Sequence, residues 1–157
     1  MPSPDRILVC DSSKCSGCYS CQIWCSFKYN QQCNPSLARL MIIPSHENWS
    51  FTLVVCRHCD DAPCLEQCPV DAIERDNKTG AIVIDAEKCT NCQVCIDACP
   101  YGVIMVDPEG NVFKCDLCGG SPVCVENCTR QALTYIIPTD TYIDQATDVG
   151  SRTVETE

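Results

Sequence analysis

The sequence is short of aromatic side chains, basic side chains and long apolar segments. Three Phe, two Trp and five Tyr among 157 residues leave little material for a conventional aromatic core. No apolar run approaches the roughly 20 residues that a membrane-spanning helix needs, so we expect no membrane anchor. The N-terminal segment has neither an apolar h-region nor twin arginines, so we expect no export signal and a cytoplasmic location.

Basic residues are outnumbered, with 11 Lys and Arg against 21 Asp and Glu, and the formal net charge is −10. Such a surface is repelled by phosphate backbones, which excludes nucleic acid as a partner. It favours docking to positively charged faces of other proteins.

Signatures of catalysis are also missing. The sequence contains no Ser-His-Asp set, no phosphate-binding loop, no dinucleotide fingerprint and no C-x3-C-x2-C spacing of radical enzymes. We therefore predict no catalytic residues and a protein that is not itself an enzyme.

Cysteine is abundant, and 16 of the 18 cysteines fall into four runs of four. Each run ends in C-x3-C, and the third has the C-x2-C-x2-C-x3-C-P spacing of bacterial ferredoxins. The runs are Cys15, Cys18, Cys21, Cys25; Cys56, Cys59, Cys64, Cys68; Cys89, Cys92, Cys95, Cys99; and Cys115, Cys118, Cys124, Cys128.

Two other uses of cysteine compete with iron–sulfur binding. A disulfide scaffold belongs to secreted proteins, and nothing in this sequence indicates secretion. Zinc sites use two cysteine pairs separated by a longer loop, rather than four cysteines in one short run. We therefore predict four [4Fe-4S] clusters, whose binding energy would also be folding energy.

Secondary structure repeats around the runs and predicts an α+β class. We expect strands over residues 6–10, 39–43, 51–55, 71–75, 81–84, 101–106, 111–114 and 133–137. Residues 44–48 are a predicted loop. A helix is expected from Cys21 to about Gln32, with Ile23, Trp24 and Phe27 facing inward. Residues 138–157 turn polar and are predicted to be a surface tail.

In a two-cluster ferredoxin, the first three cysteines of one run share a cluster with the last cysteine of its partner run. Runs two and three pair most simply through the hairpin between them, which leaves runs one and four for each other. The predicted quartets are Cys15, Cys18, Cys21, Cys128; Cys115, Cys118, Cys124, Cys25; Cys56, Cys59, Cys64, Cys99; and Cys89, Cys92, Cys95, Cys68. Pairing of run one with two and of run three with four stays open.

Several residues near the runs carry secondary predictions. Cys10 and Cys33 lie outside the runs and are predicted not to be ligands. Ser26 and Thr129 stand where Pro follows Cys68 and Cys99, so no proline sets the local turn after Cys25 or after Cys128. Cations near a cluster favour its reduced state, and the candidates are Lys14, Lys88, Lys114, Arg57 and His58, with solvated side chains as the alternative.

The order of the runs and the segments CRHCDDAPCLEQCPVDAI and CTNCQVCIDACPYGVI resemble the iron–sulfur subunits of molybdenum or tungsten pterin oxidoreductases. That family includes small cytoplasmic subunits serving hydrogenases, carbon monoxide dehydrogenase and tungsten aldehyde oxidoreductases. The resemblance covers about residues 5–137. It implies two pseudo-symmetric bacterial-type ferredoxin lobes, one nested within the other: an outer lobe of residues 1–50 and 107–137, and an inner lobe of residues 51–106.

The resemblance also implies a function. We expect an electron-transfer subunit that relays electrons between a catalytic oxidoreductase subunit, of the tungsten aldehyde type, and a second redox protein or flavoprotein subunit. The alternatives are a free-standing diffusible polyferredoxin and a relay for hydrogenase or carbon monoxide dehydrogenase.

Overall fold

The structure, a computed structural model, describes residues 6–137, so the predicted tail lies outside the described residues. The described strands form four separate two-stranded antiparallel sheets. The pairs are β1 (Ile7–Cys10) with β8 (Leu133–Ile136), β2 (Leu40–Ser45) with β3 (Ser50–Val55), β4 (Ile73–Arg75) with β5 (Ile82–Ile84), and β6 (Met105–Val106) with β7 (Val112–Phe113).

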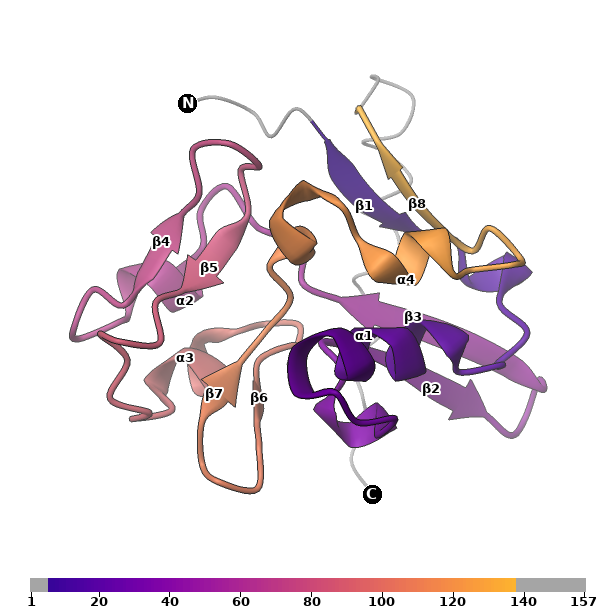
Figure 1. Ribbon diagram of the computed structural model, residues 1–157, viewed down its shortest axis with the longest axis horizontal. Helices are drawn as coiled ribbons and strands as arrows, with labels where there is room; N and C mark the ends of the chain where they lie inside the picture. Colours follow the sequence, from indigo (N-terminus) through magenta and orange to yellow (C-terminus); the bar gives the residue numbers. More distant parts are fainter. Residues whose placement is uncertain (1–5, 138–157) are drawn as a thin grey trace.

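Three of these sheets are hairpins that connect consecutive cysteine runs, and the fourth joins the two ends of the described chain. β1 enters run one and β8 leaves run four, and Ile7 lies opposite Ile136 in their register. Segments more than 120 residues apart in sequence are therefore hydrogen-bonded neighbours (Figure 1).

Each run contributes one α-helix, and the third cysteine of every run lies in it. The helices are α1 (Ser20–Asn30), α2 (Pro63–Glu66), α3 (Val94–Ala98) and α4 (Val123–Glu126), and three short 3-10 turns are η1 (Ser12–Lys14), η2 (Pro35–Leu37) and η3 (Leu117–Gly120). Cys21, Cys64, Cys95 and Cys124 are all buried. The helical turn therefore directs this cysteine of each run into the interior.

The helices pack in two pairs. α1 contacts α4, and α2 contacts α3. In Figure 1, α2 and α3 lie with β4 and β5 on the left, whereas α1 and α4 lie with β1, β8, β2 and β3 on the right. The elements of runs one and four are thus neighbours, as are those of runs two and three.

Three small apolar clusters replace one continuous core. One lies around α1, β2, β3 and α4, a second around α2, β4, β5 and α3, and a third between them, where Val103 and Leu117 are about 2 % exposed. Cysteines belong to all three clusters. The packing of the interior therefore depends on the groups that the thiols bind. This agrees with the small number of aromatic side chains available to fill a core.

The predicted inward orientation of Trp24 and Phe27 is wrong. Their side chains are 46 % and 48 % exposed and form an edge-to-face pair with ring centroids 6.3 Å apart. The physical reason is helical periodicity, because Cys21 and Cys25 occupy the inner face of α1 and residues 24 and 27 fall on the opposite one.

Other boundaries differ from the predictions by a few residues. α1 ends at Asn30, because Gln31 adopts a left-handed conformation. β2 extends two residues into the predicted loop, as far as Ser45. The strand predicted over residues 101–106 is limited to Met105–Val106. Gly102, with φ of 59°, belongs instead to a turn in which its N–H donates to the carbonyl of Cys99.

Candidate iron–sulfur sites

All four runs share one backbone feature: the residue just before the second cysteine is left-handed. These residues are Gly17, His58, Asn91 and Leu117, with φ of 67°, 51°, 55° and 56°. Such residues turn neighbouring N–H groups toward one side of the loop and create a concave site for an anion. A [4Fe-4S] cluster with four thiolates is an anion, so this backbone suits it.

Cys56, Cys59, Cys64 and Cys99 line the first cavity of the inner lobe. The rest of its wall combines apolar side chains, among them Ile82, Val103 and Ile104, with the basic side chains of Arg57, His58 and Lys114. The structure thus brings the first three cysteines of run two to the last cysteine of run three.

Cys68, Cys89, Cys92 and Cys95 line the second cavity of the inner lobe. Ile73, Ile84 and Val112 lie around these thiols. Here run three meets the last cysteine of run two, which is the reciprocal arrangement.

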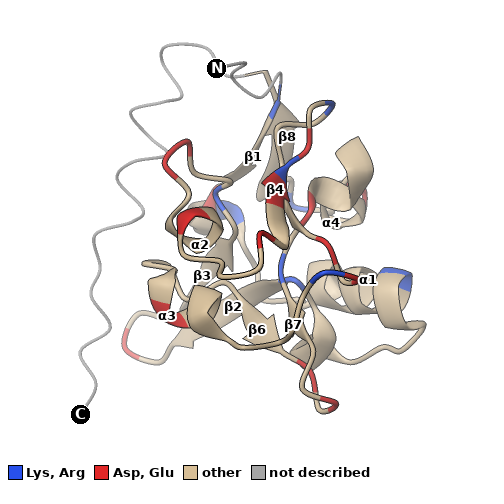
Figure 2. Cartoon of the chain, turned by 90° about the vertical axis from the view of Figure 1, so that its left-hand side faces the viewer, with Lys and Arg blue, Asp and Glu red and all other residues tan. Residues whose placement is uncertain are grey.

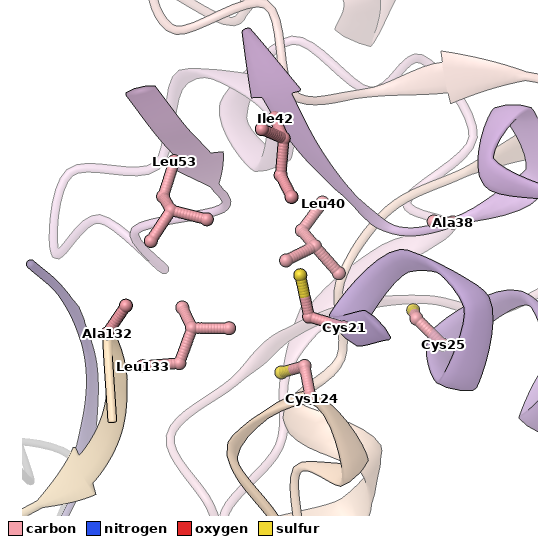
Figure 3. Close-up of a cluster of buried hydrophobic side chains, with 9 residues drawn as sticks. All are labelled: Cys21, Cys25, Ala38, Leu40, Ile42, Leu53, Cys124, Ala132 and Leu133. Carbon is pink, nitrogen blue, oxygen red and sulfur yellow. The ribbon is translucent and has the colours of Figure 1, made fainter. Parts of the chain in front are cut away.

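The thiols of runs one and four also meet. Burial, together with the nearby thiols of Cys15, Cys128 and Cys18, raises the pKa of Cys21 to about 12. Burial likewise raises the pKa of Cys124, and its neighbouring thiols are Cys115, Cys118 and Cys25, followed by Cys21 of the other quartet. Figure 3 shows Cys21, Cys25 and Cys124 among the buried side chains of this cluster.

Backbone N–H groups point at several sulfur atoms. The N–H of Arg39 donates to Cys25 Sγ at 3.2 Å, Ala72 to Cys68 Sγ at 3.3 Å, and Ala132 to Cys128 Sγ at 3.2 Å. Such donors stabilise negative charge on a ligated sulfur and raise the potential of a cluster.

The missing proline at position 129 leaves the turn unchanged. Asp71 after Cys68 and Gln131 after Cys128 are both left-handed, and each donates its N–H to the carbonyl of the cysteine three residues before it. After Cys25 the absence of proline has the expected effect, since α1 continues through Ser26.

The donor set fits cubane clusters. Four thiols and several apolar side chains line each of the two cavities, and buried His58, which lines the first, has no hydrogen-bond partner at Nε2. Among residues 6–137, no three ligating side chains converge as they would on a single ion. A cubane carries its four thiolates on four different irons, so its ligands stand further apart.

Contacts between runs one and four include a polar network that sequence reasoning missed. Arg39 Nη1 lies 2.8 Å from Asp116 Oδ2, and the Arg39 guanidinium lies 3.4 Å from the ring centroid of Tyr29. The Tyr29 hydroxyl donates to the same carboxylate. The network ties α1 to the loop between Cys115 and Cys118, and no local motif predicts it.

The three lysines that precede runs one, three and four have different surroundings. Lys14 pairs with Asp11, and Lys88 with Asp85 and Glu74, with side chains 57 % and 54 % exposed. Lys114 is only 3 % exposed. The Arg57 guanidinium lies 4.6 Å from the ring centroid of Tyr101.

The two cysteines outside the runs lie in different places. Cys33 is exposed, whereas Cys10 ends β1 beside run one. Burial and the neighbouring Cys21 raise the pKa of Cys10 to about 12. Cys10 therefore faces the first predicted cluster site without belonging to a run.

We expect Cys10→Ala and Cys33→Ala to leave the iron content of the anaerobically purified protein unchanged, because each predicted quartet is complete without them. Iron and sulfide analysis tests this, with Cys21→Ala as the positive control. Loss of four irons in the Cys10 variant would make Cys10 a ligand.

Within residues 6–137, the helices are too short and too polar for any of them to cross a bilayer.

The fold and the thiol sites define an iron–sulfur protein. The family model for the 4Fe-4S dicluster domain matches residues 47–136, and the chain belongs to that family. A solved chain of the BamBC active-site complex of benzoyl-coenzyme A reductase with bound benzoyl-CoA has a similar fold, with a TM-score of 0.50 at 20 % identity over 96 % of this chain and 92 % of that one.

Similar proteins include YsaA of Escherichia coli (strain K12), which carries the provisional name of an electron transport protein. It is 37 % identical over 82 % of this chain and 88 % of its own length. The polyferredoxin-like subunit of the aliphatic sulfonate oxidoreductase of Pyrococcus furiosus is 40 % identical over 73 % of this chain and 66 % of its own length. These findings confirm the predicted class, a 4Fe-4S electron-transfer protein related to oxidoreductase subunits.

The chain spans smaller parts of other relatives. It is 36 % identical to NrfC of Escherichia coli (strain K12), of which it covers 63 %. It is 34 % identical to the beta subunit of NADH-dependent phenylglyoxylate dehydrogenase of Aromatoleum evansii, of which it covers 30 %.

Proposed function

We propose that the chain is a non-catalytic subunit that relays single electrons through four [4Fe-4S] clusters between a catalytic oxidoreductase subunit and another redox partner. The observation that carries this proposal is the gathering of thiols from paired runs, most clearly in the two inner cavities. With four thiolates on each cluster, no iron is open to a substrate.

The ligand sets remain those expected from the sequence, and we propose them for the folded protein. Residues 51–106 would form the inner lobe, and residues 1–50 with 107–137 the outer lobe. The contacts of α2 with α3 and of α1 with α4 support this division, as does the pairing of β1 with β8.

The count of four clusters goes beyond the family description. A dicluster domain has two clusters, and the matched residues 47–136 contain runs two, three and four. Twelve cysteines in that segment and four more in run one would supply ligands for four cubanes.

The protein would contribute geometry, charge and exclusion of water. When bound, each cluster supplies one-electron chemistry. The thiols of each quartet would hold it in place, and the N–H groups of Ala72, Ala132 and Arg39 would stabilise its negative charge. Val103 and Ile104, 2 % and 4 % exposed, would keep water from the first inner site.

For the catalytic partner we propose an oxidoreductase of the tungsten aldehyde type, and for the other side a redox protein or flavoprotein subunit. The similarity to polyferredoxin-like and dehydrogenase subunits supports a role within a complex. Acidic residues occur on α2, on α3 and on β4 (Figure 2), which favours a partner with a basic face. Cytoplasmic location stays a prediction.

Direction of transfer is part of the proposal. Electrons would enter at the inner lobe and leave through the outer lobe. Cys18→Ala should then preserve reduction of the inner clusters by substrate in the assembled complex, while onward transfer to the acceptor falls. Single-turnover spectroscopy would measure both steps. If the inner clusters assemble but are no longer reduced by substrate, the direction is the reverse.

Co-purification separates the subunit from a free-standing polyferredoxin. Under anaerobic affinity purification of the native protein, a subunit should retain a catalytic chain in constant proportion. A tagged chain that elutes alone, with four clusters and full competence to reduce small redox proteins, would favour the diffusible alternative.

A further inference from the structure

Lys114 is a buried cation at the junction of the two helix pairs. It follows β7 and immediately precedes Cys115, and its residue is 3 % exposed. Its ammonium donates to the carbonyl oxygens of Ile82 and Cys115, the second at 2.9 Å. These contacts fix the ammonium between β5 and the first loop of run four.

No carboxylate within residues 6–137 forms an ion pair with Lys114, whereas Lys14 and Lys88 each pair with acidic side chains. An ammonium removed from water is strongly disfavoured unless an anion or enough hydrogen bonds compensate it. Two carbonyl dipoles satisfy two of its three protons. The positive charge of the Lys114 ammonium is then stabilised fully only if an anion lies nearby.

The anion is indicated by the cavity that Lys114 lines. Cys56, Cys59, Cys64 and Cys99 line the same cavity. Two other basic side chains line the cavity, and both have partners of their own. His58 Nδ1 accepts the N–H of Ile82 at 2.9 Å, and the Arg57 guanidinium lies 4.6 Å from the ring centroid of Tyr101.

We infer that the Lys114 ammonium is the built-in counter-charge of the cluster held by Cys56, Cys59, Cys64 and Cys99, and that it raises the reduction potential of that cluster. The inference rests on the proposed clusters. Reduction adds one electron and one negative charge, which a fixed positive charge in a dry site stabilises, so no proton needs to enter. The reduced state of this cluster is then favoured, at the place where the thiols of the inner lobe lie next to run four.

The sequence offers matched controls, because Lys14 and Lys88 occupy the same position before runs one and three but are half-exposed. We would compare Lys114→Met, Lys88→Met and Lys14→Met by redox titration of the anaerobic holoprotein, followed by electron paramagnetic resonance. Met removes the charge and keeps an unbranched side chain of similar length. The signal of this cluster is assigned by its absence in Cys64→Ala.

In Lys114→Met we expect the ratio of reduced to oxidised cluster at this site to fall at least tenfold at a fixed potential, a shift of about 59 mV for one electron. The cluster bound through Cys115, whose carbonyl also accepts from Lys114, should shift less than this one. The other two clusters should change less than twofold, and so should all four in both controls, where water screens the charge. Lys114→Arg keeps the charge and should keep most of the potential.

Unchanged potentials in an assembled Lys114→Met protein would overturn the inference, and so would equal shifts in the Met and Arg variants, which would indicate packing. If Lys114→Met loses four irons while the controls lose none, the ammonium stabilises that cluster as inferred. Loss of all iron in both Lys114→Met and Lys114→Gln would make the residue structural and contradict the inference. A wild-type protein without a cluster on this quartet would refute the proposed function instead.

Discussion

Replacing Cys124 by alanine should lower the iron content of anaerobically purified protein from about sixteen to about twelve atoms per chain. Cys124 is buried in α4, and its neighbouring thiols are Cys115, Cys118 and Cys25. Without it, one cubane loses a ligand, and the other nearby thiol, Cys21, is already a predicted ligand of the neighbouring cluster. Iron and sulfide analysis gives the count, and Cys33→Ala is the control. A wild-type content of about eight would restrict the chain to the two clusters of a dicluster domain.

The same variant distinguishes the two possible pairings of the runs. With runs one and four paired, Cys25→Ala and Cys124→Ala remove ligands of one cluster and should abolish the same paramagnetic signal. With run one paired with two, Cys25→Ala would instead abolish the signal that Cys64→Ala abolishes. The short N–H contact from Arg39 to Cys25, and the ion pair of Arg39 with Asp116, favour the first outcome.

Gly17→Ala should prevent assembly of the cluster of run one and lower the melting temperature. Gly17 has φ of +67°, and a Cβ built on it would lie 2.3 Å from Cζ of Phe51, the aromatic residue of β3. The left-handed backbone alone costs a side chain about 1–2 kcal/mol. The overlap must then move either the ring or the loop that carries Cys15 and Cys18. Iron analysis and thermal unfolding monitored by circular dichroism would measure the effect.

Gly119→Ala is the matched control, since Gly119 has φ of +69° but open space around its would-be Cβ. Gly119→Ala should be destabilised only by the cost of its left-handed backbone, and it should keep all four clusters. Phe51→Ala combined with Gly17→Ala should recover part of the lost iron, because the ring is removed. An iron content of Gly17→Ala equal to that of Gly119→Ala would contradict the steric argument.

The sequence alone determined the class of this protein. Thiolate spacing within one run is a local property of the chain, so C-x2-C followed by C-x3-C indicates cubane ligation whatever surrounds it. Strand positions were also predictable, because apolar segments alternate with turn residues such as Gly80 and Gly110. The left-handed residue before the second cysteine was predictable at Gly17 and Asn91, but not at Leu117, where only the folded loop imposes it.

Tertiary structure decided which side chains became buried. Lys14, Lys88 and Lys114 are equivalent in sequence, yet only Lys114 enters the interior, because β5 and the inner cavity lie against the loop that carries it. Trp24 and Phe27 are apolar but lie outside, because cysteines occupy the inner face of α1. Local patterns describe one segment at a time, whereas burial and charge compensation depend on segments brought together by folding.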